Sequence, residues 1–135
     1  QGAAAYYEQE NWGNTLVAPG NAAAASTHCV AASATQSSFT ASDQKFVVDW
    51  EAETDAATYQ AFNFAPADPI YFEYNVTSDT PGCGNAADDT NIYEFEANGD
   101  LDGDATQSTF RLLAGSNGDN ALYRAPGIAN ASPLE

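Results

Sequence analysis

The stretch NIYEFEANGDLDGDATQSTFRLL, residues 91–113, decides the fold of this chain. Its first part, 91–97, alternates apolar and polar side chains, and its last part, 106–113, alternates again. Alternation with a period of two is typical of β-strands that bury one face, and the Asn, Gly and Asp residues between the two parts are turn formers. The stretch therefore predicts two antiparallel strands joined by an acidic turn. The side chains expected on the covered face are Tyr93, Phe95, Phe110 and Leu112.

The sequence on both sides extends this pair into a sheet. Residues 70–76, IYFEYNV, alternate in the same way, and a short run at 121–124 is expected as a fourth strand at the edge. Turn-rich segments separate the runs, so consecutive strands should pair as an antiparallel meander with one covered face. On the exposed face, Arg111 is expected across from Glu94 or Glu96.

The N-terminal residues predict a helix. Residues 1–12 start Ala-rich and contain good helix formers, and Asn11-Trp12-Gly13 provides a signal for the helix end. Because a helix of about three turns is marginal alone in water, it must dock on a core or continue a longer helix. Tyr6, Tyr7 and Trp12 are the residues expected to dock.

The region between helix and sheet, residues 15–68, is expected to be an irregular connection. It is rich in Ala, Ser and Thr at first, and its later part, 44–64, is ambiguous. Residues 46–50 could form a short strand, and residues 50–62 could form one or two helical turns. One helix, a long loop and an antiparallel sheet of three to four strands predict an α+β fold. We expect a single domain over residues 1–135, with the helix packed on a meander that spans 69–125.

The charge of the chain is strongly one-sided. Nineteen Asp and Glu residues face three basic residues, which gives a net charge of −16 over 135 residues. A surface without clustered Lys and Arg does not bind nucleic acid, and an anionic membrane surface repels it. The acidic surface provides solubility and an affinity for cations, and it is also the adaptation expected of a salty medium. Repulsion between copies predicts that the isolated domain is a monomer at low ionic strength.

The chain contains two cysteines, Cys29 and Cys83. Neither belongs to a CxxC pair, and the single histidine, His28, cannot complete a tetrahedral zinc site with them. Two lone cysteines in an acidic, lysine-poor chain fit an extracytoplasmic disulfide, which stabilises a domain of this kind by about 4 kcal/mol in the chain-entropy model. Two buried free thiols are the alternative.

The acidic turn NGDLDGDATQS is the sharpest local motif. Asp100, Asp102 and Asp104 have the spacing that opens an EF-hand loop, in which carboxylates converge on one hard cation, so they are the candidate ligands for calcium. The match is incomplete, because an EF-hand has Gly at its sixth position and an acid at its twelfth, where this chain has Ala105 and Arg111. The alternative is a plain acidic hairpin turn.

The chain lacks the motifs of common catalysis. It contains no GxSxG, no HExxH and no glycine loop that cradles phosphate. A catalytic triad would have to use His28, in an irregular segment rich in Ala and Ser. Pairs of carboxylates arise by chance among nineteen acids, and Glu94 and Glu96 are expected on a solvated face. We therefore expect no enzyme and no required cofactor.

Several segments, taken in order, resemble a known family. A helix end, Ala-Tyr-Tyr-Glu running to Asn11-Trp12-Gly13, is followed by PIYFEYNV at 69–76, by FEANGDLDGD at 95–104 and then by Ser-Thr-Phe. The order and spacing of these segments resemble type IV pilins and pilin-like proteins, over residues 3–14 and 69–113.

The resemblance implies an extracellular, ladle-shaped filament subunit. Such a subunit has an apolar N-terminal helix, preceded by a peptidase cleavage site, which inserts the precursor in the membrane and later contacts other subunits in the filament core. Here that helix would precede Gln1, because residues 1–135 contain no signal peptide and no apolar run of transmembrane length. At the other end, Leu134-Glu135 resembles a cloning scar.

Two other functions are compatible with the same residues. One is a pseudopilin of type II secretion, which has the same fold; the other is a free-standing, calcium-dependent surface adhesin or binding module. A full-length gene with an apolar N-terminal segment, a Gly-Phe junction and a Glu at the fifth mature position would decide for a pilin. Filaments of this family serve motility, adhesion, DNA uptake or secretion.

Overall fold

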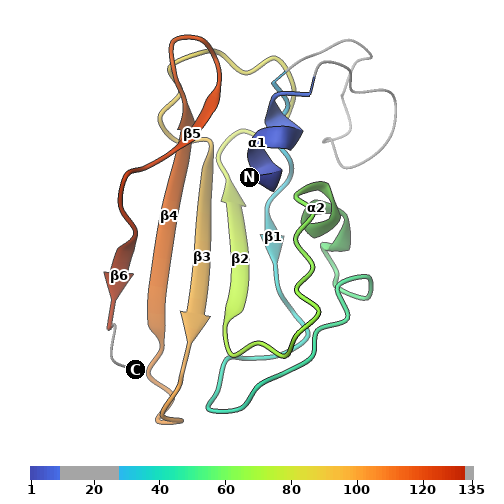
Figure 1. Ribbon diagram of the computed structural model, residues 1–135, viewed down its shortest axis with the longest axis vertical. Coiled ribbons are helices and arrows are strands. Elements are labelled where there is room, and N and C mark those ends of the chain that lie inside the picture. The colour runs from blue at the N-terminus through green and yellow to red at the C-terminus, as the bar shows by residue number, and fades with distance from the viewer. Residues whose placement is uncertain (10–27, 133–135) are drawn as a thin grey trace.

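The computed structural model describes residues 1–9 and 28–132, and there it shows an antiparallel sheet accompanied by two short helices (Figure 1). The helices are α1 (Gly2–Tyr7) and α2 (Ala56–Ala61). The strands are β1 (Ala34–Thr35), β2 (Glu73–Ser78), β3 (Tyr93–Gly99), β4 (Ser108–Ser116), β5 (Leu122–Arg124) and β6 (Ala129–Ala131). This is an α+β arrangement in which the sheet dominates.

Within the described part of the chain the sheet has six strands, in the order β1-β2-β3-β4-β5, with β6 also paired to β4. Strand β4 borders two short strands because residues 114–116 pair with β5 and residues 109–111 pair with β6. The central strands β2, β3 and β4 confirm the predicted meander. The prediction of three to four strands is wrong, since β1 and β6 extend the sheet. These two strands have only two and three residues, too few for an alternating pattern to be recognised.

The register gathers the apolar side chains of the central strands on one face. Phe95 of β3 lies opposite Val76 of β2 and Leu112 of β4. On the other face Glu96 lies opposite Arg111, whose Nε is 2.8 Å from a carboxylate oxygen of Glu96. The predicted ion pair is thus confirmed, although an exposed pair of this kind contributes little to stability.

Helix α1 is shorter than the helix predicted for residues 1–12, because it ends at Tyr7. Two hydrogen bonds connect the end of α1 to a distant part of the chain. The hydroxyl of Tyr7 donates a 2.7 Å hydrogen bond to the side-chain oxygen of Asn120, and the carboxylate of Glu8 accepts a 3.1 Å bond from the backbone N–H of Leu122. These bonds hold the end of α1 against the β4–β5 hairpin.

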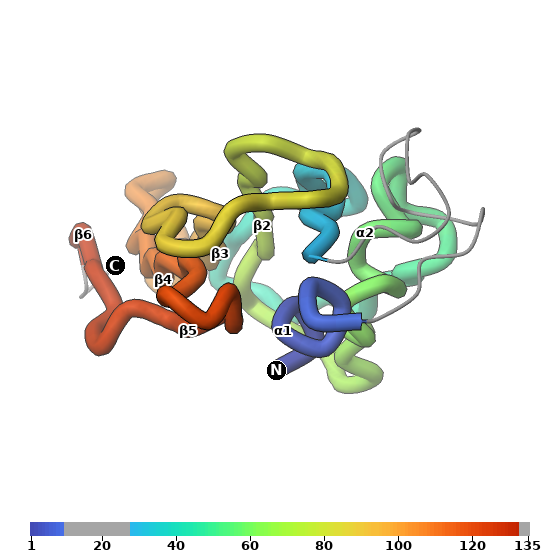
Figure 2. The backbone as a smooth tube through the Cα atoms, turned by 90° about the horizontal axis from the view of Figure 1, so that it is seen from above, coloured from blue at the N-terminus to red at the C-terminus, as the bar shows by residue number. Residues whose placement is uncertain are grey.

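The side chains of α1 that were expected to dock are buried. Tyr6 and Tyr7 belong to the hydrophobic core, together with Ala3, whereas Trp12 and the rest of the predicted end signal lie outside the described residues. Seen from above, α1 and β5 lie on the same side of β2 and β3 (Figure 2). None of the helices among the described residues is long and apolar enough to cross a membrane.

The described part of the connection predicted for 15–68 contains regular elements as well as loop. Besides β1 and α2, an isolated antiparallel bridge joins Phe46 to Ile70. Residues 44–64 therefore contain an extended contact at Phe46 and, further along, helix α2. Its aromatic side chains pack together: the rings of Trp50 and Tyr59, for example, have centroids 5.0 Å apart.

The disulfide predicted between Cys29 and Cys83 is confirmed. It links positions 54 residues apart and is flanked by an isolated bridge, in which Val30 and Gly82 exchange backbone hydrogen bonds of 2.6 and 3.0 Å. The segment that leads into β1 is therefore fixed to the β2–β3 connection by a covalent bond and by backbone pairing.

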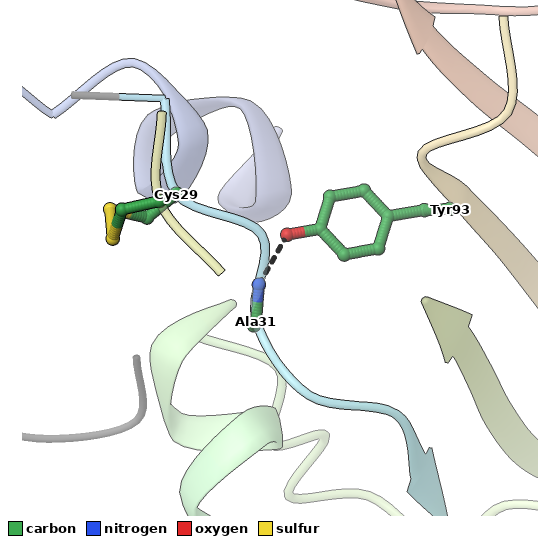
Figure 3. Close-up of a disulfide and its surroundings, with 4 residues drawn as sticks. Cys29, Ala31 and Tyr93 are labelled. Carbon is green, nitrogen blue, oxygen red and sulfur yellow. Dashed lines mark hydrogen bonds between the residues drawn. A yellow bond between two sulfur atoms is a disulfide. The ribbon is translucent and has the colours of Figure 1, made fainter. Parts of the chain in front are cut away.

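Tyr93 of β3 holds the same segment from the sheet side. Its hydroxyl accepts a 2.8 Å hydrogen bond from the backbone N–H of Ala31 (Figure 3). Both residues are fully buried. Burial raises the pKa of Tyr93, so the hydroxyl is neutral when it accepts this bond.

Candidate functional site

An apolar groove lies over the apolar face of β2, β3 and β4. Its cavity volume is about 460 Å³, within the range of roughly 300 to 1,000 Å³ that is typical of binding pockets. The walls come from β5, from the segment after α2 and from the first turn of α1. The residues that line the groove include Phe64, Tyr74, Phe95, Leu112, Leu122 and Tyr123.

The floor of the groove is only partly covered by the rest of the molecule. Val76 is buried, but its register partner Phe95 is half-buried, and so is Leu112, the partner of Phe95 on β4. Residues 1–4 line the groove, so α1 begins beside the apolar floor. A concave, mainly apolar site of this volume is the default candidate for a binding site in a soluble domain. Alternation in the sequence predicted the apolar face, but it gave no sign that the face would remain open.

Arg124 of β5 stands at the rim of the groove. It is exposed, and within residues 1–9 and 28–132 it has no ion-pair partner. The other two basic side chains are engaged: Arg111 pairs with acids of β3, and the ammonium of Lys45 lies 5.1 Å from the centre of the Tyr71 ring. Among the residues that the structure describes, Arg124 is therefore a cation beside the groove that forms no ion pair.

The three aspartates of the predicted cation site follow β3 directly. Asp100 is 6% exposed, whereas Asp102 and Asp104 are exposed. Ligand oxygens of the three carboxylates lie within 4.8 Å of one another, so the loop brings all three candidates together. Asp100 accepts hydrogen bonds from the backbone N–H groups of Gly103 at 2.9 Å and Ala105 at 3.1 Å, which fixes the loop around the buried carboxylate.

This donor set suits a hard cation. Calcium takes six to eight oxygen ligands, among them carboxylates, and each aspartate keeps free lone pairs after its bonds to backbone N–H groups. A fourth carboxylate approaches the loop: a side chain at Gly103 would lie 3.4 Å from the carboxyl carbon of Asp43. Asp43 was not predicted, because nothing in the sequence links it to the acidic turn. Arg111, at the twelfth EF-hand position, pairs with Glu96 on the exposed face of the sheet instead.

A second group of carboxylates, also missed from the sequence, lies beside β1. Glu53 is 5% exposed and accepts bonds from the backbone and hydroxyl of Ser37, while Asp55 accepts one from the N–H of Thr35. Desolvation by burial acts to raise the pKa of Glu53, but hydrogen bonds from Ser38 and Ser37 lower it below its ordinary value. These carboxylates satisfy backbone N–H groups in and after a very short strand.

Comparisons with protein-family models, with curated proteins and with solved structures find no match. The functional argument therefore depends on what the groove and the acidic loop offer chemically. The groove offers apolar surface and one cation, and the loop offers hard oxygen ligands. His28, the one histidine of the chain, belongs to neither; its ring lies 5.3 Å from that of Tyr7.

Proposed function

We propose that the chain is the extracellular head of a type IV pilin-like filament subunit, and that a helix preceding Gln1 continues α1 through the apolar groove. The observation that carries this proposal is the position of the groove, which has residues 1–4 in its wall. The N-terminus lies on the same side of the sheet as β5, at the start of α1 (Figures 1 and 2). A helix that runs into Gln1 would therefore reach α1 beside the floor of the groove.

The energetics of α1 support a longer helix. With six residues, α1 is well below the length of roughly 12 to 15 residues at which isolated helices become stable in water. A longer helix in the groove would cover Phe95 and Leu112, and each square ångström of apolar surface removed from water contributes about 25 cal/mol. The result would be the expected layer arrangement, a helix packed on one face of an antiparallel sheet.

The charge and the disulfide support an extracellular filament. Disulfides persist in oxidising compartments, and the bond between Cys29 and Cys83 is part of this fold. Heads that each carry a net charge of −16 repel one another, so the subunits would associate through their apolar helices. The isolated domain would then remain a monomer at low ionic strength.

The full-length gene and the cell surface test the proposal. We expect an apolar segment before Gln1, with a Gly-Phe junction and a Glu at its fifth mature position. We also expect antibodies against residues 1–135 to label filaments in electron micrographs of the source cells. A polar domain in place of the apolar segment, or the same filaments in cells that lack the gene, would contradict the proposal. A pseudopilin would have the same N-terminal segment, but deletion of its gene would abolish protein secretion.

The acidic loop supports a second proposal, that the domain binds calcium through Asp100, Asp102 and Asp104. The carrying observation is that their oxygens lie within 4.8 Å of one another. In a calcium-dependent surface adhesin or binding module, this loop would be the functional site. Calorimetric titration with calcium at constant ionic strength tests the binding, and no heat above that of dilution would contradict it.

A further inference from the structure

Arg124 occupies an unusual place in a chain this acidic. Nineteen Asp and Glu residues face three basic residues, so an arginine readily meets a carboxylate, as Arg111 does with Glu96 at 2.8 Å. Arg124 has no such partner among the described residues, although it belongs to β5, the strand that forms one wall of the groove. Its guanidinium is available at the edge of an apolar surface.

A helix that fills the groove would change the surroundings of this guanidinium. It would exclude water from the rim, and a cation that loses water without gaining a counter-charge destabilises the packed state. A carboxylate on the helix would compensate through charge-assisted hydrogen bonds, which are bidentate for arginine. Since Arg124 is held in register with Ala114 of β4, the carboxylate would have to stand at one fixed level along the helix.

We propose that Arg124 selects a helix that carries an acidic side chain on its groove-facing side. The inference rests on the proposed function, since it takes the occupant to be the helix that precedes Gln1. It specifies the chemistry of that helix: apolar side chains against Phe95 and Leu112, and one Asp or Glu that meets Arg124. The ion pair would also offset the repulsion between an acidic helix residue and a head with a net charge of −16.

The experiment compares two forms of the protein. One is the domain of residues 1–135, and the other is the full-length chain, with its native N-terminal helix, in detergent. In each form Arg124→Gln is measured beside Arg111→Gln, which removes the same net charge from the opposite face of the sheet. Relative to this control, we expect Arg124→Gln to lower the Tm of the full-length chain by roughly 1 to 4 °C at low salt. The difference should shrink at high salt and be absent in the domain.

Arg124→Met separates the charge from the side-chain stem. An arginine stem can cover apolar surface while its head stays in water, and methionine would preserve that covering. If the ion pair is the role of Arg124, the Met variant of the full-length chain loses as much stability as the Gln variant. If the Met variant keeps the Tm of the unchanged protein, Arg124 acts through its stem and the inference is wrong.

Occupancy of the groove is measured independently with a cysteine at its floor. Leu112→Cys should react with a maleimide roughly tenfold more slowly in the full-length chain than in the domain, because reaction requires the helix to open; Leu122→Cys serves if that variant does not fold. Equal rates in the two forms would show that the helix lies elsewhere, and the proposed function would fail. Slow reaction combined with equal effects of Arg124→Gln and Arg111→Gln would retain the proposed function and overturn the role of Arg124.

Discussion

Gly2 of α1 packs against the backbone carbonyl of Phe62, the C-cap of α2, so closely that a Cβ at residue 2 would overlap the carbonyl oxygen. The two helices therefore meet backbone to backbone. Nearby, the rings of Tyr6 and Phe62 have an edge-to-face contact with centroids 6.0 Å apart. This contact sets the position of the first turn of α1 beside the groove.

Gly2→Ala tests the contact, because two effects of opposite sign compete. Alanine favours a helix over glycine by up to about 1 kcal/mol, but the added methyl group must displace α1 from Phe62, and overpacking costs about 1 to 3 kcal/mol. We expect a net loss of stability in thermal unfolding and faster hydrogen exchange at the N–H of Ala5, which donates to Gln1. Ala5→Gly, on the exposed side of α1, is the control for propensity alone. A stabilised Gly2→Ala protein would show that the helices do not meet in this way.

Tyr93→Phe removes the acceptor for the buried N–H of Ala31. Because the N–H would then be unsatisfied inside the core, we expect a loss of about 1 to 3 kcal/mol in the free energy of unfolding. Chemical denaturation measures it, with Tyr123→Phe as the matched control, since Tyr123 is 45% exposed. Equal stability of the two variants would mean that the hydrogen bond of Figure 3 contributes nothing.

Glu53 makes the stability of the domain depend on pH. Its pKa in the folded protein lies below the ordinary value of 4.5, so its carboxylate adds stability that is complete above that value and is lost as the pH falls through the folded pKa. Glu53→Gln should reduce stability at neutral pH by about 1 to 3 kcal/mol and flatten the decline in acid. The comparison is Glu51→Gln, which changes an exposed acid of the same segment.

The decisive measurement is the slope of unfolding free energy against pH below the ordinary value of 4.5. The pKa of Glu96 is also lowered, chiefly by a hydrogen bond from Asn98. Because Glu96 is unchanged in both variants, it contributes equally to the pH dependence of their stability. A Glu53→Gln protein that loses stability in acid as steeply as the Glu51→Gln protein would refute the role assigned to the Ser37 bonds.

The features that the sequence predicted well are those with a local signal. Alternation located β2, β3 and β4 and placed Phe95 and Leu112 on one face. The disulfide was predicted because the chain contains only two cysteines, so each had a single candidate partner. Each of these inferences needed only a periodic pattern or a choice between very few partners.

The features that it missed depend on contacts between distant segments. The end of α1 is hydrogen-bonded to Asn120 and Leu122, far along the chain. Strand β1 has only two residues, and side chains such as that of Asp55 bond its backbone. Asp43 approaches the acidic loop through the path of the chain after β1. The groove exists because of how much of the apolar face α1 and α2 leave open, which no local pattern reports.

Calcium should stabilise the domain if Asp100, Asp102 and Asp104 converge on it. A ligand that binds only the folded state adds about 2.7 kcal/mol at a hundredfold excess over its dissociation constant. Because any salt also screens the net charge of −16, each melting curve with calcium needs a partner curve in sodium chloride at the same ionic strength. Magnesium should replace calcium poorly, since it requires tighter octahedral geometry and retains its waters.

The structure selects Asp102→Asn as the test variant for this site. Asp100 is buried and accepts two backbone bonds, so its replacement would disturb the loop itself. Asp102 is exposed, and its Oδ1 accepts a 3.3 Å bond from the N–H of Asp104 that an asparagine oxygen can preserve. Asp102→Asn should therefore abolish the increment that is specific to calcium and keep the response to salt, while Asp119→Asn, in an exposed turn remote in sequence from the loop, should keep both. If calcium and matched sodium chloride give the unchanged protein the same Tm, the acidic loop is a hairpin turn and nothing more.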